Sequence, residues 1–523
     1  MTIKKLGMSP LSNAIRLALA ITAAGAMGHA LADDAPRYIV KFKAGASERV
    51  KGEIGRHHGR MHHHLKESDA MSIEVAADGL AKLRRHPDVE FIEEDVKRYP
   101  FALTSASTGT PYLTGQLVPY GIKQVQADLL SDANAGNRKV CIIDSGVDRA
   151  HDDINANSIN MTGEYDSGTG NWYTDENHHG THVAGTIAAV NNSGIGVVGV
   201  NPNRKLKIHI VKVFGKDGWA YSSSLAAAAN KCAAAGANVI SMSLGGTTSS
   251  TTERNAFDAL ERKGILSIAA AGNDGNTVVS YPGGYTSVMM VGAVDENKAW
   301  ASFSQYNSKV EIAGPGVQVL STVPMGAGTE SSLKVGTTTY APGDMTGSPV
   351  KSATAALADF GIGDKVNTAV SGKVCLIARG TVDFATKVSN CQNSGGVGAV
   401  IYNNAAGAFG GTMGTTVVTI PSVTATDTDG AALKTKLGQS TTVAVKATNY
   451  AYFDGTSMAT PHVSAVAALV WSYFPSCTGT QIRSSLTKSA LDLGPAGRDV
   501  KFGFGLVQAK AAKDRIASLG CGN

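Results

Sequence analysis

The chain has little net charge and no long apolar run beyond its N-terminal region. Its 47 Lys plus Arg residues against 42 Asp plus Glu residues give a formal net charge of +5, and most of this excess lies in the first 105 residues. The remainder is close to neutral, which gives no reason to expect binding to nucleic acid or to an anionic membrane. Charged residues make up only 17% and glycines number 60, which favours a compact enzyme with tight turns over a disordered or coiled-coil chain.

The first 32 residues have the features of a secretory signal peptide. Lys4, Lys5 and Arg16 precede the apolar stretch 17–27, and the small-residue pattern Ala-Leu-Ala ends at Ala32. This pattern predicts cleavage after Ala32. The alternative is a membrane anchor, but the apolar run is too short to span a bilayer comfortably. The sequence therefore predicts a secreted protein, extracellular or periplasmic, with no membrane anchor.

Six cysteines are present, and none lies in a Cys-x-x-Cys pair. In an exported protein all six can form disulfides. Cys375 with Cys391, and Cys477 with Cys521, are close in sequence and are expected pairs. Cys141 and Cys232 remain, and for them two buried free thiols are nearly as good an interpretation as a disulfide. The sequence alone leaves this choice open.

Three short motifs carry residues suited to nucleophilic catalysis. Asp144 ends the apolar run 140–143, His179 opens a small-residue segment, and Ser457 shortly precedes the apolar run 463–471. A serine hydroxyl needs a base to take its proton, and histidine suits that task because its pKa lies near neutrality. A carboxylate on the other ring nitrogen fixes the tautomer. The order Asp, His, Ser is one of three that serine hydrolases of unrelated folds use.

These motifs resemble those of the subtilisin-like serine proteases, and the resemblance covers about residues 116–325 and 450–510. It implies a serine endopeptidase that hydrolyses peptide bonds in proteins through an acyl-enzyme intermediate. Ser457 would be the nucleophile, His179 the general base and acid, and Asp144 the orienting carboxylate. The resemblance also implies that Asn273 donates its side-chain N–H to the oxyanion, together with the backbone N–H of the serine.

Other classes of protein share parts of this pattern. A catalytically dead relative used as a binding module is one, but the complete triad with Asn273 argues against it. An α/β-hydrolase esterase needs Gly-x-Ser-x-Gly, whereas Ser457 has Thr456 before it and Ala459 two positions after it. A metal cluster in the segment 178–182 lacks the glutamate of the metalloprotease motif.

The resemblance also implies the substrate-binding residues. The family pairs the substrate backbone with two edge strands, so protein and peptide substrates are the expected partners of a monomeric enzyme. The residues expected to pair with the substrate backbone are Ser243, Leu244 and Gly245 on one edge, and Asp217, Gly218 and Trp219 on the other. Those expected around the residue before the scissile bond are the wall residues Ala270, Ala271 and Gly272, with Asp274 at the rim and Ser280 at the base. Small walls predict a preference for large apolar residues.

A structural Ca²⁺ site is the expected cofactor site, again from the resemblance. Its predicted ligands are the side chains of Gln116, Asp153 and Asn192 and the carbonyls of Val190, Ile195 and Val197. An all-oxygen set of this kind suits Ca²⁺. The same loop contains Gly-x-Gly-x-x-Gly over 194–199, but a helix rather than a strand is expected before it, and Pro202 follows closely, so nucleotide binding is not predicted.

Residues 33–105 resemble the inhibitory propeptide of this family, a small α+β unit that acts as an intramolecular inhibitor and is removed by self-cleavage. Strands are expected at 37–42 and 89–95. The cut is expected between Phe101 and Gly115, with Leu103-Thr104 favoured. Six of the 13 histidines lie here, which is interpreted as a solvated basic loop, a pH-sensitive switch or an adventitious metal site.

Apolar strands and small-residue helices alternate after residue 118, which predicts an α/β fold with a mainly parallel sheet flanked by helices. The expected strands are 140–143, 208–213, 239–242, 265–270 and 288–294, and the expected helices are 225–235 and 257–263. About 125 residues then interrupt the family pattern, and they resemble a β-rich protease-associated domain. The predicted organisation is a signal peptide at 1–32, a propeptide at 33–105, a catalytic domain at 106–326 and 450–523, and an inserted domain at 327–449.

Overall fold

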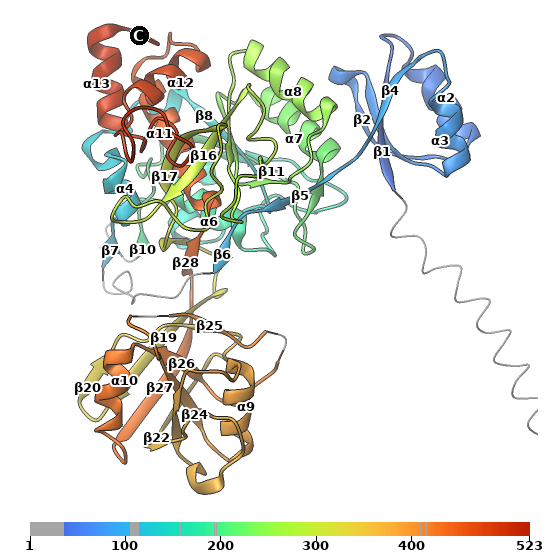
Figure 1. Cartoon of the computed structure of the whole chain (residues 1–523). Coiled ribbons are helices and arrows are strands. Elements are labelled where there is room, and N and C mark those ends of the chain that lie inside the picture. The colour runs from blue at the N-terminus through green and yellow to red at the C-terminus, as the bar shows by residue number, and fades with distance from the viewer. Residues whose placement is uncertain are drawn as a thin grey trace, which may run out of the picture. The chain divides into compact units, whose positions relative to one another are not determined.

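The chain forms two compact units, one ending at Val96 and the other spanning Lys97–Asn523 (Figure 1). The computed structural model describes residues 36–104, 115–155, 158–192, 194, 196–407, 409–414 and 416–523. The predicted signal peptide lies outside these residues. Among the residues described, no helix combines the length and the apolar character needed to cross a membrane.

The first unit is a four-stranded antiparallel sheet, in the order β2-β3-β1-β4, with two helices. Its elements are β1 (Arg37–Phe42), α2 (Ser47–Arg56), β2 (Arg60–Leu65), β3 (Ala70–Glu74), α3 (Ala77–Leu83) and β4 (Val89–Glu94). Apolar residues alternate along β1, so Val40 and Phe42 reach the core with Ile54 and Met71. Three of the clustered histidines, 62–64, lie in β2 and are partly buried, so this part of the cluster is a strand and not a solvated loop.

The second unit is built on a seven-stranded parallel sheet, in the order β17-β16-β15-β13-β8-β11-β9. The strands are β8 (Lys139–Asp144), β9 (Met161–Gly163), β11 (Lys207–Lys212), β13 (Val239–Met242), β15 (Leu266–Ala270), β16 (Val288–Val294) and β17 (Val310–Pro315). Near-continuous apolar runs form these strands because a parallel sheet is covered on both faces. The predicted α/β fold class is therefore confirmed.

Helices accompany this sheet (Figure 1). One of them is buried along almost its whole length. They are α4 (Tyr120–Gln124), α5 (Asp152–Asn155), α6 (His179–Ala188), α7 (Ser222–Ala234), α8 (Thr251–Arg262), α11 (Thr456–Tyr473), α12 (Gly479–Lys488) and α13 (Ala509–Leu519). The buried helix is α11, which packs on β13, β15, β16 and β17 and on α6. A helix that is apolar all round has no solvated face, and this explains its central place.

Short strand pairs complete the second unit. They are β5 (Lys97–Pro100), β6 (Leu103–Thr104), β7 (Gln116–Leu117), β10 (Gly196–Val197), β12 (Ala220–Tyr221), β14 (Leu244–Gly245), β18 (Val319–Thr322) and β28 (Tyr450–Asp454). The order β12-β5-β14 places β5 between two edges of the unit, and β18-β28-β6 forms a second small sheet.

Between β18 and β28 the chain forms a separate seven-stranded mixed sheet, in the order β20-β19-β27-β22-β23-β24-β26. Its elements are β19 (Gly328–Val335), β20 (Thr338–Tyr340), β22 (Lys351–Asp359), β23 (Val374–Ala378), α9 (Phe384–Asn393), β24 (Gly398–Tyr402), β26 (Ser422–Ala425), α10 (Asp427–Lys434) and β27 (Ser440–Thr448), with the small pair β21 (Met345–Thr346) and β25 (Gly411–Thr412). This segment has its own apolar clusters, centred on Val388 and Ile401 and on Leu376 and Val443.

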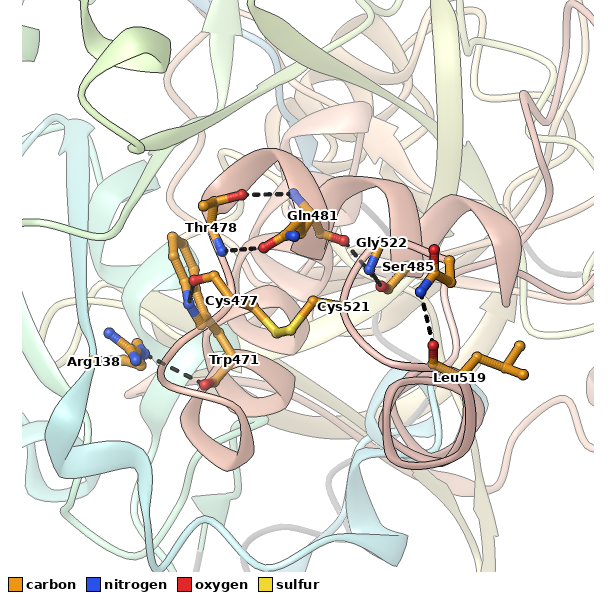
Figure 2. The surroundings of a disulfide bond; sticks show 10 residues. Arg138, Trp471, Cys477, Thr478, Gln481, Ser485, Leu519, Cys521 and Gly522 are labelled. Carbon is orange, nitrogen blue, oxygen red and sulfur yellow. Dashed lines mark hydrogen bonds between the residues drawn. A yellow bond between two sulfur atoms is a disulfide. The ribbon is translucent and has the colours of Figure 1, made fainter.

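All six cysteines are paired. The expected bonds Cys375–Cys391 and Cys477–Cys521 are present, and Cys141 of β8 bonds Cys232 of α7. Free thiols at the last pair are therefore the wrong alternative. Figure 2 shows the Cys477–Cys521 bond between the start of α12 and the end of the chain.

Candidate active site

Asp144 and His179 lie side by side at the carboxyl end of β8. Asp144 is the last residue of β8, and His179 is the first residue of α6. Both are buried, and His179 Nδ1 lies 2.7 Å from Asp144 Oδ1. The same carboxylate oxygen accepts the N–H of Ser145 at 2.7 Å. Because Nδ1 donates to the carboxylate, Nε2 of the neutral ring is left as the acceptor.

Ser457 is the second residue of α11 and is fully buried. Its hydroxyl donates to the carbonyl of Ser243 at 2.9 Å, and the hydroxyl of Ser243 donates back to the carbonyl of Ser457 at 2.7 Å. His179 Nε2 is buried and has no hydrogen-bond partner among the described residues. Nε2 of His179 is therefore available to accept a proton, while the hydroxyl of Ser457 donates to Ser243.

The carbonyl oxygen of Phe101 lies between two donors. Asn273 Nδ2 donates to it at 2.9 Å, and the backbone N–H of Ser457 donates at 3.3 Å. Asn273 is itself held in place, because its Oδ1 accepts both the N–H and the hydroxyl of Thr456 at 2.9 Å. Two converging N–H donors on one carbonyl are the arrangement that stabilises a developing oxyanion.

The segment that ends at Phe101 is held as an added strand. β5 pairs antiparallel with β14, with Leu244 opposite Pro100 and Gly245 opposite Tyr99. The N–H of Phe101 donates to the carbonyl of Ser243 at 3.2 Å. All three residues predicted on this edge therefore contact β5 or Phe101. A side chain on Gly245 would meet the Phe101 ring within 2.6 Å, so the ring lies directly over this glycine.

The other predicted edge is displaced along the chain. The pairing with β5 comes from β12, with Ala220 opposite Arg98 and Tyr221 opposite Lys97, and not from 217–219. Gly218 has a φ of +68°, a left-handed backbone that cannot continue a strand, so the segment before β12 is a turn. Asp217 and Gly218 do not pair with β5, and their contact with a substrate backbone stays a prediction.

Trp219, from the same turn, contacts β5 through its ring. The Lys97 ammonium lies 4.2 Å from the Trp219 ring centroid, and Tyr221 packs edge-on against the same ring.

The predicted pocket wall is buried and closely packed. Ala270, Ala271 and Gly272 follow one another at the end of β15, and Ser280 is buried near Gly272, whereas Asp274 is exposed. Gly272 has a φ of +109°, and an added Cβ would lie 1.6 Å from the Gln305 amide oxygen and 3.1 Å from the Ser280 hydroxyl. Gln305 was missed by the sequence analysis, because it belongs to a loop with no motif.

Of the predicted calcium ligands, Gln116, Asp153, Asn192 and the Val190 carbonyl converge. Val197 reaches the group through its N–H, and Ile195 lies outside the described residues. Gln116 Nε2 donates to the Val190 carbonyl at 2.8 Å and to Asn192 Oδ1 at 3.2 Å, and Asn192 Nδ2 donates to Asp153 Oδ1 at 2.8 Å. The other oxygen of Asp153 accepts the N–H of Val197 at 2.9 Å.

Burial raises the pKa of Asp153, which makes this carboxylate costly to keep ionised without a cation. Rotation of the two amide groups would turn their oxygens inward. The donor set therefore fits a hard cation.

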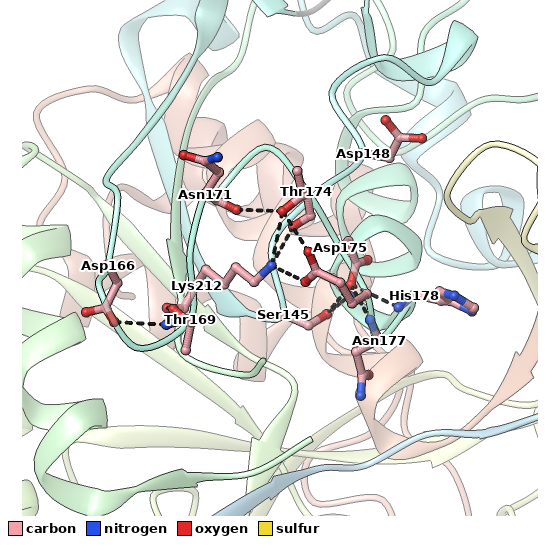
Figure 3. A network of polar contacts seen from close by, with 12 residues as sticks. Ser145, Asp148, Asp166, Thr169, Asn171, Thr174, Asp175, Asn177, His178 and Lys212 are labelled. Atoms are coloured by element: carbon pink, nitrogen blue, oxygen red, sulfur yellow. Dashed lines mark hydrogen bonds and ion pairs between the residues drawn. The ribbon is translucent and has the colours of Figure 1, made fainter. Parts of the chain in front are cut away.

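A second buried carboxylate, Asp175, links the residue after Asp144 to the start of the helix that carries His179. The sequence analysis missed it. Asp175 accepts the hydroxyls of Ser145 (2.8 Å) and Thr181 (2.6 Å) and the backbone N–H groups of Thr181 (2.8 Å) and His178 (2.9 Å). Figure 3 shows this carboxylate between Ser145 and the start of α6. Because Ser145 follows Asp144 and α6 begins with His179, Asp175 holds both catalytic candidates in register.

The neighbouring histidines do not form a metal cluster. His182 is fully buried, and its Nε2 lies 3.0 Å and 3.1 Å from the carbonyls of Val319 and Ala451, while its ring stacks on Phe453. Burial, together with His179, lowers the pKa of His182 to about 3. In the part of the chain that the structure describes, no three His, Cys, Asp or Glu residues are placed to hold a metal.

Comparison with known proteins gives the same picture. The model of the subtilase family matches residues 136–357 and 380–505. Subtilisin NAT of Bacillus subtilis subsp. natto is 36% identical over 300 residues, which are 55% of this chain and 74% of that protein. Subtilisin DY of Bacillus licheniformis is 40% identical over 217 residues, 40% of this chain and 76% of that protein.

A solved structure extends the likeness to the fold. The crystal structure of the psychrophilic subtilisin-like protease Apa1 from the Antarctic psychrotroph Pseudoalteromonas sp. AS-11 is similar, with a TM-score of 0.61 and 45% identity. The match covers 78% of this chain and all of that one. With the family model matching well over half of its residues, this chain belongs to the subtilase family and is a subtilisin-like serine protease.

Proposed function

We propose that this chain is a secreted endopeptidase with Ser457 as nucleophile, His179 as general base and Asp144 as orienting carboxylate. The observation that carries the proposal is the carbonyl of Phe101. It accepts hydrogen bonds from Asn273 Nδ2 and from the N–H of Ser457, as the carbonyl of a substrate about to be attacked would. The hydroxyl that should attack this carbonyl belongs to Ser457, whose N–H is one of the two donors.

The reaction follows from these positions. The Ser457 hydroxyl turns from the Ser243 carbonyl to the open Nε2 of His179, which takes its proton as the oxygen attacks the carbonyl carbon. The C–O bond forms and the oxyanion is held by the two N–H donors. The tetrahedral intermediate then expels the amine, which takes the proton from His179. Water attacks the acyl-enzyme with His179 again as base, and the serine is restored.

The first substrate in this proposal is the chain itself, at the bond between Phe101 and Ala102. An added side chain at Gly455 would lie 2.4 Å from the Phe101 oxygen and 3.3 Å from Ala102 Cα, so this bond passes the start of α11. The bond favoured from sequence, Leu103-Thr104, lies two residues further on, where β6 pairs with β28. After cleavage, residues up to Phe101 remain on β14 and β12 as a product-like inhibitor.

Calcium is proposed as a structural cofactor. Gln116, Asp153, Asn192 and the carbonyl of Val190 would hold it, with carbonyls from 195–197 completing the set. The ion would neutralise the buried Asp153 carboxylate and tie β7 to β10.

The inserted segment 327–449 is proposed to be a protease-associated domain that influences the access of large substrates. Its support is the separate sheet and core of Gly328–Thr448, joined to the rest through β18 and β28. Deletion of 327–449 should then change the cleavage of a folded protein more than that of a short peptide. Equal changes for the two substrates would leave the insert a passive module.

The deciding experiment compares wild type with Ser457→Ala by intact mass spectrometry after export. Wild type is expected to yield a mature chain beginning at Ala102, and the variant is expected to keep residues 33–101. If both are cut alike, a host protease matures the chain, and peptide turnover must decide the catalytic role. If wild type begins at Thr104 or later, the proposed register at Phe101 is wrong.

A further inference from the structure

The side chain of Arg98 is the largest that is fully buried in the described residues, although it belongs to the segment that occupies the substrate path. Its guanidinium forms a two-pronged contact with Glu253, with Nε to Oε1 at 3.0 Å and Nη2 to Oε2 at 2.6 Å. Glu253 is also fully buried. A bidentate arginine–carboxylate pair of this kind is strong and geometrically selective.

Glu253 is also held by contacts that do not involve β5. It is the third residue of α8, whose N-cap is Ser250, and its own N–H donates to the Ser250 hydroxyl. The hydroxyl of Tyr285 donates to Glu253 Oε2 at 2.7 Å and also accepts the N–H of Ser250 at 2.9 Å. The carboxylate is therefore held with one face toward β5.

The register of β5 fixes the position of Arg98 relative to the proposed scissile bond. With Phe101 before the scissile bond, Pro100 and Tyr99 lie opposite Leu244 and Gly245, and Arg98 is the fourth residue back. Arg98 lies opposite Ala220, so the β12 edge holds the backbone at this position. Lys97, one residue further back, places its ammonium over the Trp219 ring, a cation–π contact.

From these contacts we propose that Glu253 selects substrates with arginine at the fourth position before the scissile bond. The preferred peptide is basic there and one residue further back, with a large apolar residue at the cut, as in Lys-Arg-Tyr-Pro-Phe. A carboxylate at the floor of this subsite rejects acidic residues and leaves apolar ones facing a buried charge without a cation beside it. The inference rests on the proposed peptidase function and adds its substrate class.

A competing explanation is that the pair serves only to anchor the propeptide. Both explanations use the same contact, but only selection of substrates extends to peptides that are not part of this chain. The test therefore uses free peptides with the mature enzyme.

The experiment measures kcat/KM for four p-nitroanilides that share Tyr-Pro-Phe and carry arginine, citrulline, leucine or glutamate in front. Citrulline keeps the shape of arginine and loses its charge. Wild type is expected to prefer arginine over citrulline by about tenfold or more, since the pair is fully buried, and glutamate is expected to be the poorest. Arginine and citrulline within about twofold of each other would overturn the proposal.

Two variants test whether the preference for arginine depends on Glu253. In Glu253→Gln the ratio of arginine to citrulline is expected to fall close to one. The matched control is Glu311→Gln, because Glu311 pairs with Arg483 in an ion pair of the same kind on β17. The control should keep the wild-type ratio, and a loss of preference in both variants would contradict a role specific to Glu253.

Failure of the peptidase proposal would look different. Wild type would then hydrolyse none of the four substrates, the leucine peptide included. Binding of the product peptide Lys-Arg-Tyr-Pro-Phe and of its citrulline form, measured by fluorescence anisotropy, needs no turnover. Tighter binding of the arginine form would support Glu253 even in that case, and equal binding would overturn it.

Discussion

Ser457 is placed by a proline four residues after it. Pro461 lies inside α11 and has no N–H, so it cannot donate to the carbonyl of Ser457 as a helical residue would. That carbonyl accepts the hydroxyl of Ser243. The freed acceptor thus ties Ser457 to Ser243, whose carbonyl also accepts the N–H of Phe101.

Asn273 is expected to act mainly in the transition state. In Asn273→Leu the donor to the Phe101 carbonyl is lost, and kcat should fall on the order of 10²–10³-fold with a smaller change in KM, a range established on the corresponding asparagine of subtilisin. Peptide kinetics on the mature enzyme measures this. Asn276→Ala, in the same loop, is the control, because its side chain accepts only the nearby N–H of Val278. A rise in KM with unchanged kcat would contradict an oxyanion role.

His462 makes stability depend on pH. It is fully buried, and burial lowers its pKa from 6.5 to about 4, although its Nδ1 lies 2.7 Å from the carbonyl of Met458. Between these values the unfolded chain binds a proton that the folded chain does not, so stability falls as pH drops from 6.5 toward 4.

In His462→Gln the slope of unfolding free energy against pH in this window should decrease by up to about 1.4 kcal/mol per pH unit. Urea unfolding of the covalently inhibited enzyme measures it. His182, with its still lower pKa, contributes a second slope that the variant keeps. An unchanged slope would show that His462 is already protonated in the fold.

The helix α8 shows how a capping residue sets an element. The apolar residues predict a helix over 257–263, whereas α8 covers Thr251–Arg262. Its first turn is polar, and Ser250 caps it by accepting the N–H of Glu253. A search for apolar residues misses such a turn, and with it the glutamate that contacts Arg98.

The Cys477–Cys521 bond ties the ends of α12 and α13 together. Gln481 and Thr478 cap α12 beside it, and Gly522 donates to the hydroxyl of Ser485 (Figure 2). Replacing both cysteines by serine releases a loop of 44 residues and should cost about 2–4 kcal/mol. Calorimetry of the inhibited enzyme checks this.

The Cys375–Cys391 bond supplies the comparison for that experiment. It closes only 16 residues, so its removal should cost less, and it lies in the inserted sheet. Peptide turnover should survive its loss. A larger loss of stability from this pair than from Cys477–Cys521 would contradict the loop-length explanation.

The proposed active site as a whole is assembled from segments far apart in the chain. Asp144, His179, Asn273 and Ser457 come from β8, α6, the loop after β15, and α11. Their relative positions depend on the parallel sheet, because the carboxyl ends of its strands meet at one edge. A change that loosens this parallel sheet should therefore affect stability and activity together.

Calcium is expected to stabilise the whole second unit. Addition of a chelator to the mature enzyme should lower its thermal midpoint and speed autolysis, since a bound ion at one hundred times its dissociation constant adds about 2.7 kcal/mol. Thermal unfolding with and without calcium measures this. Asn192→Ala should abolish the difference and the adjacent Asn191→Ala should keep it. A wild-type midpoint that is insensitive to the chelator would show that no calcium site is formed.

Local chemistry in the sequence determined a good part of this protein. The three motifs are short and contiguous, so they identify the family without any knowledge of the fold, and apolar runs such as 239–242 and 288–294 coincide with β13 and β16. Family, fold class and enzyme class followed from such segments. The disulfide Cys141–Cys232 did not, because spacing along the chain says nothing about two residues 91 positions apart.

Only the tertiary structure decided the contacts that join distant segments. The register of β5 brings the carbonyl of Phe101, and not the Leu103-Thr104 bond, between the two N–H donors. On its other edge β5 pairs with Ala220 and Tyr221. The pairing of Arg98 with Glu253 spans 155 residues. The physical reason is the same in each case. Backbone pairing and a buried charge depend on which groups meet in space, and nothing local in the sequence specifies that meeting.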